Sequence, residues 1–494
     1  MELKISFKKQ PEKNIFILLS EVKFSSDLVS LIPQGLIKEI KNIKSQLKLN
    51  FGHSTQIINS STAQEQQRIF IIGTKSKAKL KNNQLQLLGY KIAKTVKDAK
   101  LKKFSIITDQ FTSKQLASIF AGLETGNYKF DDFISNKKKK THKYEEVNFI
   151  TQNSTKELKE LLTEANYLSD SINLVKDLVN TPSLSMTPTT LETIAKQIAN
   201  KSKKIKFRSF GEKEIQKKNL NLIYSVGLGS GQESKLIFLE YLNGNKKDKP
   251  IMIVGKGVTF DAGGLNLKLT NSIENMKTDM AGAATVLGFF DLLTKLDLPL
   301  NIVGIIPSVE NLLGHNAYKP GDILTAYNGK TVEITNTDAE GRLILADAIS
   351  YGIKEYNPTT IIDLATLTGA CIVALGYTRT GLITNSNKLF KQFWNAAKKT
   401  GDTIWPLPLD KYHRDKVHGD ISDYKNWTGG VMAGAIMGGA FIEKFVEKKP
   451  WVHLDIAGSS HTDSQIGQYE KGATGRPLSL LVEFLKNQIP KTTK

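Results

Sequence analysis

The sequence predicts an α/β fold of two α/β domains, a smaller N-terminal one and a larger C-terminal one, joined by a long helix. Short, nearly continuous apolar runs, typical of strands buried on both faces, alternate with segments of three-and-four apolar spacing, typical of helices. The chain has 494 residues, 40% of them hydrophobic, which is more than one core usually supports. An unbroken helical stripe from Leu158 to Val179 suits a connector, because a helix of about 25 residues spans about 40 Å.

The first domain shows this alternation before a lysine run at residues 137–140, which has no apolar face and is interpreted as a linker or loop. The predicted strands are residues 14–19, 68–73 and 103–108, and the predicted helices are residues 34–48, 82–99 and 113–123. We assign residues 1–150 to an N-terminal domain with an oligomerisation or regulatory role, residues 151–180 to the connecting helix and residues 181–494 to the C-terminal domain.

Beyond Pro182, strand signals lead into a glycine-rich loop. The predicted strands are residues 205–209, 220–226, 235–241 and 250–254. The stretch Gly227-Leu228-Gly229-Ser230-Gly231 lies between predicted strands and offers no helix N-terminus to a phosphate, so it is interpreted as a turn. Gly255-Lys256-Gly257 is no P-loop, because it lacks the upstream glycine and the following Ser or Thr.

The net charge of +20 is concentrated in the first third of the chain. Residues 1–150 hold 27 Lys and Arg against 13 Asp and Glu, a net charge of +14. Such a basic region invites a nucleic-acid interpretation. However, the excess is nearly all lysine scattered among Asn and Ile, which favours a lysine-rich surface over a surface that reads DNA.

The single cysteine, Cys371, excludes an internal disulfide and a cysteine-rich zinc site, and its apolar setting indicates a core thiol. No apolar run approaches the roughly 18 to 20 residues that a membrane span needs. The N-terminus shows no signal-peptide pattern. The sequence therefore predicts a cytosolic, cytoplasmic protein with no membrane partner.

The stretch Thr335-Asn-Thr-Asp-Ala-Glu-Gly-Arg-Leu343 places two carboxylates where a predicted strand gives way to a predicted helix. Ligands in α/β folds usually bind at such ends. Asp338 and Glu340 are two residues apart, so an extended backbone would point both side chains the same way. Two adjacent carboxylates repel each other unless a proton or cation lies between them. A metal site is the first hypothesis, and an ordinary acidic turn is the alternative.

A second segment, between Val254 and Ala284, carries charged residues among small and apolar ones. Its charged residues of interest are Lys256, Asp261, Lys268 and Asp279. Each alone is more often a solvated or paired surface charge. Together with Asp338 and Glu340 they provide four carboxylates without an HExxH or paired-cysteine motif. Oxygen-rich ligation of two divalent ions would neutralise these carboxylates.

These stretches resemble the leucyl aminopeptidase (cytosol aminopeptidase) family of dinuclear metallo-exopeptidases, peptidase family M17. Residues 336–343 match the family signature Asn-Thr-Asp-Ala-Glu-Gly-Arg-Leu throughout. The glycine-rich lysine segment, the runs at 363–370 and 453–458, and Thr474-Gly-Arg-Pro477 are also similar. The resemblance covers about residues 165–485, and it implies a mixed central sheet flanked by helices in a catalytic C-terminal domain.

Carried over by position, the resemblance implies one metal ion on Lys256, Asp261, Asp279 and Glu340, and a second on Asp261, Asp338 and Glu340. The ions would be Mn or Zn, although Mg and Co also accept such sites, and they would activate a water as the nucleophile. Lysine ligates only as a neutral amine, which a neighbouring dication favours.

The resemblance also assigns catalytic roles to Lys268, which would stabilise the oxyanion, and to Arg342, which would hold a bicarbonate ion. The alternative for Arg342 is a salt bridge to Asp338 or Glu340. The substrate's side-chain pocket would be formed by Met276, Thr366, Gly369 and Ala457, and the carbonyl of Leu367 would contact the substrate. This apolar lining favours Leu or Met as the released residue, with broad specificity.

The sequence thus predicts a hydrolase that releases N-terminal residues from peptides, and the resemblance implies a homohexamer. A DNA-binding regulatory role of the basic N-terminal domain is the alternative, although no helix-turn-helix, zinc-finger or stacking motif supports it. An inactive homologue would need a missing ligand, and the ligand set is complete. The glycine-rich stretch 429–439 suits either core packing or a subunit interface.

Overall fold

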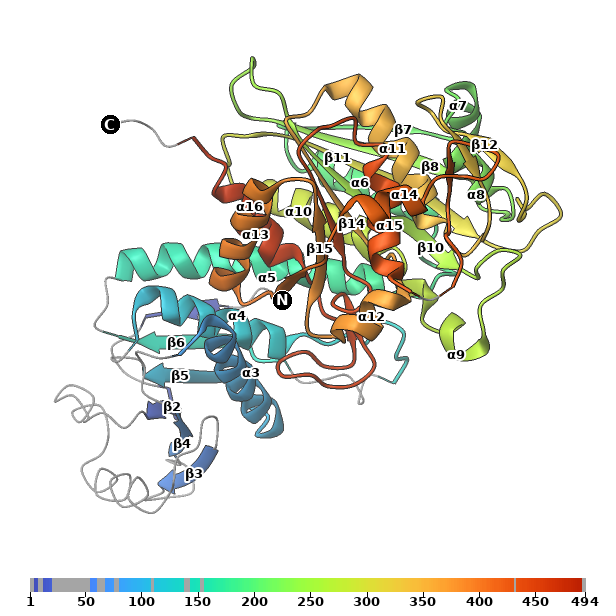
Figure 1. The fold of residues 1–494 in the computed structure, drawn as a ribbon. Helices are drawn as coiled ribbons and strands as arrows, with labels where there is room; N and C mark the ends of the chain where they lie inside the picture. Colours follow the sequence, from blue (N-terminus) through green and yellow to red (C-terminus); the bar gives the residue numbers. More distant parts are fainter. Residues whose placement is uncertain are drawn as a thin grey trace. The chain divides into compact units, whose positions relative to one another are not determined.

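The computed structural model describes residues 4–7, 12–19, 54–59, 67–74, 80–107, 111–136, 143–151, 155–430 and 432–490. The chain divides into two compact units (Figure 1). The first runs to Ser169 and includes Gly467–Tyr469, and the second comprises Asp170–Ile466 and Glu470–Lys494. The division falls inside helix α5, which spans Thr155–Asn180. At 26 residues this helix is about 39 Å long.

The first unit is built on a six-stranded sheet in the order β1-β6-β5-β2-β4-β3, parallel except at β3. Its strands are β1 (Lys4–Ser6), β2 (Asn14–Leu19), β3 (Ser54–Asn59), β4 (Gln67–Gly73), β5 (Lys103–Ile107) and β6 (Glu146–Ile150). Its helices α3 (Asn82–Asp98) and α4 (Ser113–Asn127) pack closely, because a Cβ on Gly89 would lie 1.8 Å from the carbonyl oxygen of Ile119. The predicted strands at 14–19, 68–73 and 103–107 and both of these helices are confirmed.

The predicted helix at 34–48, the lysine run at 137–140 and the end of the strand predicted to reach residue 108 lie outside the described residues.

The second unit is built on a nine-stranded mixed sheet in the order β16-β15-β18-β14-β9-β11-β8-β7, with β10 paired to β11. The strands are β7 (Ile205–Phe210), β8 (Lys235–Leu242), β9 (Ile251–Gly255), β10 (Gly257–Asp261), β11 (Asn301–Asn311), β14 (Thr360–Ala365), β15 (Thr380–Thr384), β16 (Ile404–Pro406) and β18 (Trp451–Asp455). The central strands β9, β14 and β18 run parallel, and all their residues except Thr360 are buried, which explains why most of their residues are apolar.

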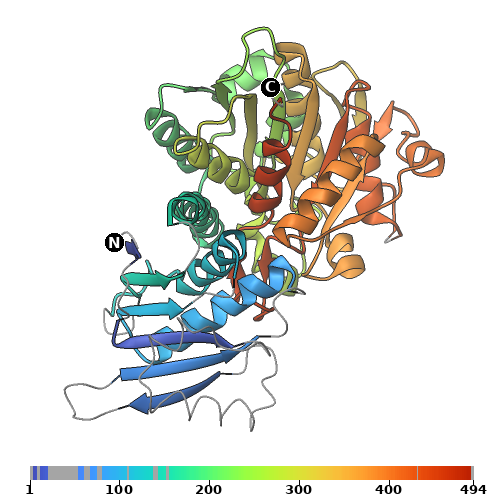
Figure 2. The ribbon, with the colours of Figure 1, turned by 90° about the vertical axis from the view of Figure 1, so that its left-hand side faces the viewer.

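Helices cover both faces of this sheet (Figure 2). Helix α10 packs against α6 and α16, whereas α11 packs against α8 and α15. The helices of the second unit are α6 (Pro188–Asn200), α7 (Glu212–Lys217), α8 (Asn221–Gly227), α9 (Thr270–Ile273), η3 (Met276–Thr278), α10 (Ala281–Leu293), α11 (Gly341–Tyr356), α12 (Gly369–Leu375), α13 (Asn387–Thr400), α14 (Lys411–Lys416), α15 (Gly434–Glu443) and α16 (Leu478–Lys486). Short strands form two small sheets: β12 (Ile323–Thr325), β13 (Thr331–Glu333) and β17 (Tyr424–Lys425), and β19 (His461–Thr462) with β20 (Gly472–Ala473).

The prediction of a strand at residues 220–226 is wrong, because this segment forms helix α8. The carboxylate of Asp347 on α11 accepts hydrogen bonds from the first-turn amides of Leu222 and Ile223, at 2.8 and 3.3 Å. These contacts stabilise the helix start from a distant part of the chain. The glycine-rich stretch beginning at Gly227 is a turn that leads into β8, as predicted, although it follows a helix.

Two glycines of the stretch 429–439 serve packing within the subunit. A Cβ on Gly439 would lie 2.6 Å from Ile383 Cδ1, and one on Gly438 would lie 2.8 Å from Leu367 Cδ2. Helix α15 therefore approaches β15 and the 366–368 segment closely. Cys371 is fully buried, as expected for a core thiol, and burial raises the pKa of its thiol. Within the described residues, no helix has the length and apolar character that crossing a membrane requires.

Candidate metal centre

The site lies where three parallel neighbours of the large sheet end. Strands β9, β14 and β18 run directly into Lys256, Thr366 and Ile456, respectively. This is the edge of an α/β sheet at which ligands usually bind. Asp338 and Glu340 come from the loop between β13 and α11. Their preceding strand therefore belongs to a small three-stranded sheet and not to the large one.

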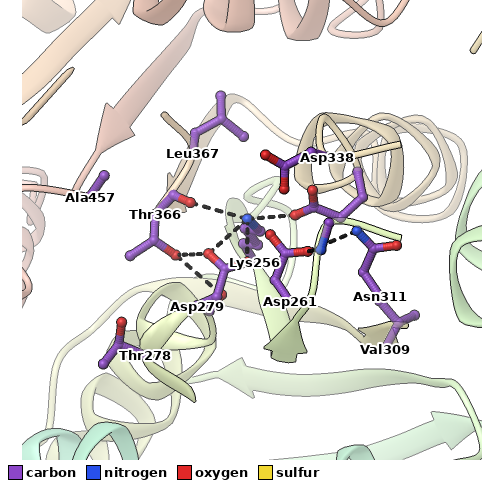
Figure 3. A network of polar contacts seen from close by, with 12 residues as sticks. Lys256, Asp261, Thr278, Asp279, Val309, Asn311, Asp338, Thr366, Leu367 and Ala457 are labelled. Atoms are coloured by element: carbon purple, nitrogen blue, oxygen red, sulfur yellow. Dashed lines mark hydrogen bonds and ion pairs between the residues drawn. The ribbon is translucent and has the colours of Figure 1, made fainter. Parts of the chain in front are cut away.

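Lys256 is the centre of the first cluster of charges (Figure 3). Its Nζ lies 2.7 Å from Asp279 Oδ2 and 2.7 Å from Glu340 Oε1, and it donates to the carbonyl oxygen of Thr366 at 3.1 Å. The three charged side chains are almost completely buried. Gly341 is required next to Glu340, because a Cβ there would lie 2.5 Å from Lys256 Cε.

Lys268 joins the other two carboxylates. Its Nζ lies 2.8 Å from Asp261 Oδ2 and also pairs with Asp338 Oδ1. Oxygens of Asp261, Asp338 and Glu340 lie within 4.8 Å of one another, a distance that one bound cation can bridge. The structure thus brings together all five predicted ligands and Lys268.

The electrostatics of this centre reflect buried like charges. Burial disfavours the charged form of Lys256, but the carboxylates of Asp279, Glu340 and Asp261 outweigh burial and raise the pKa of this lysine. Burial raises the pKa of Asp279 to about 8, and burial together with Asp261 raises the pKa of Asp338 to about 7. Four carboxylates in a dry site therefore require cations, which the two ammonium groups supply in this arrangement.

Arg342 occupies the first turn of α11 without a carboxylate partner. Its Nη1 donates to the carbonyl oxygen of Asn426 at 2.8 Å, while its buried Nε has no hydrogen-bond partner among the described residues. Neither Asp338 nor Glu340 forms an ion pair with it within the part of the chain that the structure describes. Burial lowers the pKa of Arg342 to about 10. The alternative of a salt bridge to Asp338 or Glu340 is therefore wrong.

Polar groups orient the ligands, and sequence reasoning missed this role of Asn311, Gly263 and Thr366, although it assigned Thr366 to substrate binding. Asn311 Nδ2 and the amide of Gly263 each donate to Asp261 Oδ1 at 2.8 Å. Thr366 Oγ1 donates to Asp279 Oδ1 at 2.6 Å. These residues fix the directions of the carboxylates, as partners of metal ligands generally do. No local signal marks Asn311, because only the pairing of β10 with β11 brings it to Asp261.

Asp455 was also missed, although it stands in the noted run 453–458. Its carboxylate accepts hydrogen bonds from Leu367 N at 3.3 Å, Ala457 N at 3.2 Å and Thr368 Oγ1 at 2.7 Å. One fully buried carboxylate therefore holds two segments that carry predicted substrate-binding residues.

The predicted substrate-binding residues divide into two groups. Leu367 and Gly369 line a cavity together with Lys268, Asp338 and Arg342. Met276 lies on η3, Thr366 contacts Asp279, and Ala457 lies on the far side of Thr366 from Asp338 (Figure 3). These three residues do not line that cavity.

The residues of the centre fit divalent cations. Carboxylate oxygens converge on one point, all but the half-buried Asp338 are buried, and neighbouring amide and hydroxyl donors orient Asp261 and Asp279. Such oxygen-rich donor sets suit divalent ions.

Comparisons with known proteins agree with this geometry. A model of the cytosol aminopeptidase family's catalytic domain matches residues 173–482. A probable cytosol aminopeptidase of Mannheimia succiniciproducens is 39% identical over 86% of each chain. The cytosol aminopeptidase of Haemophilus influenzae is 36% identical over 94% of this chain and 95% of its own.

The fold is also that of a solved structure, the bottromycin maturation enzyme BotP in complex with Mn, with a TM-score of 0.84 and 23% identity. The match covers 97% of this chain and 100% of that one. At this identity the likeness shows the fold alone. The family model and the relatives show more: the chain belongs to the cytosol aminopeptidase family of metallo-aminopeptidases.

Proposed function

We propose that this metallo-aminopeptidase releases N-terminal residues, preferentially Leu, Met and similar ones, from peptides with the help of two divalent ions. The observation that supports the proposal most strongly is the convergence of Asp338 with the buried Asp261 and Glu340 on one point, beside Lys256 and Asp279. Family membership supports the reaction class.

Lys256, Asp261, Asp279 and Glu340 would hold one ion, and Asp261, Asp338 and Glu340 would hold the other. Bound divalent ions, Mn or Zn, supply the Lewis acidity that makes water a nucleophile near neutral pH. Lys256 can ligate only as a neutral amine, so ion binding should release its proton. The substrate's free α-amine would reach the same centre, which explains why only N-terminal residues are removed.

Two cations of the chain act on the reacting carbonyl in this proposal. Lys268, with a side chain 15% exposed, would stabilise the developing oxyanion, because a preorganised positive charge is most effective where water is excluded. Arg342 would hold bicarbonate, since its planar fork suits a bidentate oxyanion and its Nε lacks a partner among the described residues. The anion would accept and return the proton that the reaction moves.

The released residue's side chain would lie against Met276, Thr366, Gly369 and Ala457, with the carbonyl of Leu367 contacting the substrate. Asp455 would keep this lining in place through its hydrogen bonds to Leu367 and Ala457. An apolar lining discriminates by only about 1 to 3 kcal/mol per methylene, so a preference for Leu or Met would be broad.

Homohexameric assembly stays a prediction from the family resemblance, whereas a cytoplasmic location and the domain roles stay predictions from the sequence. DNA binding by the basic region 1–150 stays the alternative function. Binding that disappears at moderate salt and ignores DNA sequence would show its charge to be incidental.

The proposal is tested by measuring metal content and hydrolysis of a leucine anilide after chelation and re-addition of Mn or Zn. We expect two ions per chain and ion-dependent release of leucine. Asp261→Asn should lose both, whereas Asp322→Asn, which alters an exposed ion pair with Lys319, should lose neither. Folded, ion-loaded protein that hydrolyses no amino-acid anilide would contradict the proposal.

A further inference from the structure

Two loops carry charged side chains of the centre. The lysine loop, residues 262–268, follows β10 and carries Lys268. The acidic loop, residues 334–340, connects β13 to α11 and carries Asp338 and Glu340. Strand β10 belongs to the nine-stranded sheet and β13 to the three-stranded one, so strand pairing does not align the two loops. Contacts between the loops must therefore do so.

Asn266 and Thr337 join the two loops by hydrogen bonds in both directions. The backbone N–H of Thr337 donates to Asn266 Oδ1 at 2.8 Å, and the backbone N–H of Asn266 donates to Thr337 Oγ1 at 2.9 Å. Thr337 Oγ1 in turn donates to the carbonyl oxygen of Gly263 at 2.6 Å. These contacts form the Asn266–Thr337 bridge, which attaches the lysine loop to the residue directly before Asp338.

Thr337 is a well-restrained point of attachment for the lysine loop. Its side chain is completely buried, and its carbonyl oxygen accepts hydrogen bonds from Tyr318 Oη at 2.7 Å and Asn311 Nδ2 at 3.0 Å. The lysine loop lies close against it, because a Cβ on Gly264 would lie 3.0 Å from Thr337 Oγ1. The amide, carbonyl and hydroxyl groups of Thr337 are thus all hydrogen-bonded, which restrains its position.

Asp338 is the carboxylate of the centre that packing restrains least. Its side chain is 33% exposed, whereas the side chains of Asp261, Asp279 and Glu340 are at most 5% exposed. Close packing on all sides holds a buried side chain in place, and a partly exposed one lacks part of that restraint. The position of Asp338 therefore depends more on contacts made by its own loop.

The bridge acts on one half of the centre. Thr337 directly precedes Asp338, and Lys268, the ion-pair partner of Asp338, belongs to the loop that the bridge holds. Lys256 and Asp279 lie outside both loops and pair with each other at 2.7 Å. Loss of the bridge should therefore displace Asp338 and leave this second pair in place.

We propose that the Asn266–Thr337 bridge positions Asp338, and that it thereby sets the affinity of the ion that Asp338 would bind, but not of the ion beside Lys256 and Asp279. This inference rests on the two-ion site of the proposed function. Asn266 and Thr337 are positioning residues, because they act on the ion through Asp338. Loss of a group that orients a metal ligand typically lowers metal affinity by about 10- to 100-fold.

The test measures Mn binding to the full chain by isothermal titration calorimetry. Asn266→Ala removes the acceptor of the Thr337 amide at an exposed position, so the variant should fold. One Kd for Mn should rise about tenfold, and the other should stay within about twofold of wild type. Thr337→Val, which removes the hydroxyl of the bridge, should act in the same way. Asn266→Asp keeps the acceptor oxygen, so neither Kd should rise.

A second comparison identifies which ion is affected. Asp338→Asn removes a ligand of only one ion, so adding Asn266→Ala to this variant should not change the Kd of the remaining ion. The matched control is Asn385→Ala, which removes another exposed asparagine whose Oδ1 accepts a backbone N–H, that of Trp451 at 2.9 Å, outside the centre. Its two Kd values should equal those of wild-type protein.

Unchanged Kd values in Asn266→Ala and Thr337→Val, or equal increases in both Kd values, would overturn the inference. So would a weaker remaining ion when Asn266→Ala is added to Asp338→Asn. Wild-type protein that binds fewer than two Mn ions would instead contradict the proposed function, so the two failures are distinguishable.

Discussion

Arg342 and Arg476 are both buried arginines of the second unit, and they are held in opposite ways. Arg476 Nε donates to Asp402 Oδ1 at 2.6 Å, and its Nη2 donates to the carbonyl oxygen of Thr378 at 3.1 Å. Within the described residues, Arg342 donates one hydrogen bond, from Nη1 to the carbonyl oxygen of Asn426 at 2.8 Å, and its Nε has no partner.

The difference separates a charge that is neutralised within the fold from a charge that, in our proposal, binds an anion. Asp402 neutralises Arg476 inside the protein, which makes the pair part of the packing. Burial lowers the pKa of Arg342 to about 10, although the charges of Glu340, Asp455 and Asp338 partly offset this effect, so keeping the guanidinium charged costs folding free energy. Buried charges that are only partly compensated are typical of functional sites.

The largest effect is expected from Glu340→Ala, which removes a carboxylate shared by the whole centre. A bound metal ion contributes several kcal/mol of transition-state stabilisation, so kcat/KM on a leucine anilide should fall about 10³-fold or more. Circular dichroism should show a folded variant. Glu310→Ala is the matched control, because Glu310 is a buried glutamate of the same unit that bonds Ser230 and lies outside the centre. Comparable losses in both variants would contradict the assignment.

Arg476→Met tests whether Arg476 serves the stability of the fold. It leaves Asp402 buried without its charged partner, so the free energy of unfolding should fall by about 3 to 5 kcal/mol, as measured by urea denaturation. The activity of the remaining folded protein should stay within about twofold of wild type. An activity loss at unchanged stability would mean that Arg476 serves the reaction.

Arg342→Met should lower activity and leave stability intact, in contrast to Arg476→Met. We expect kcat to fall about 10²-fold, because a positioned charge is lost, while the free energy of unfolding stays unchanged or rises, because an only partly compensated buried charge is removed. Steady-state kinetics and urea denaturation measure the two effects. Destabilisation as large as that of Arg476→Met would show that the two arginines do not differ in role.

Binding of Mn should change the free energy of unfolding differently in these variants. Mn at about 100 times its Kd should raise the free energy of unfolding by about 2.7 kcal/mol per bound ion, or about 5.4 kcal/mol for two ions, in wild-type protein and in Arg476→Met, but not in Glu340→Ala. Chelation should reverse the shift. Thermal unfolding at fixed protein concentration measures it.

The increase in the free energy of unfolding that Mn causes should depend on pH. Burial raises the pKa of Asp338 to about 7 and that of Asp279 to about 8, so without an ion the folded protein binds more protons there than the unfolded one. Their contribution to stability is then lost as pH rises through 7 to 8. Mn replaces those protons, so its stabilising effect should be larger at pH 8.5 than at pH 6. A pH-independent shift would contradict this linkage.

Most elements of the fold could be predicted because their signals are local. Strands β2, β4, β5 and β9 are continuous apolar runs, and helices α3, α4 and α5 carry apolar residues at helical spacing. The strand predicted at 220–226 failed because Leu222, Ile223 and Val226 are apolar in a run too short to show a helical period. What stabilises that helix start is Asp347, 125 residues from Leu222 along the chain.

The charged residues of the site can be identified from sequence alone, because the stretch 336–343 and the lysine segment contain its carboxylates and cations. Which of these groups form ion pairs and hydrogen bonds with one another depends on the tertiary structure. It pairs β10 with β11 and so places Asn311 on Asp261, it joins Leu367 to Ala457 through Asp455, and it leaves Arg342 without a carboxylate. Local sequence encodes residue type and periodicity, whereas burial and hydrogen bonding between distant segments exist only once the chain has packed.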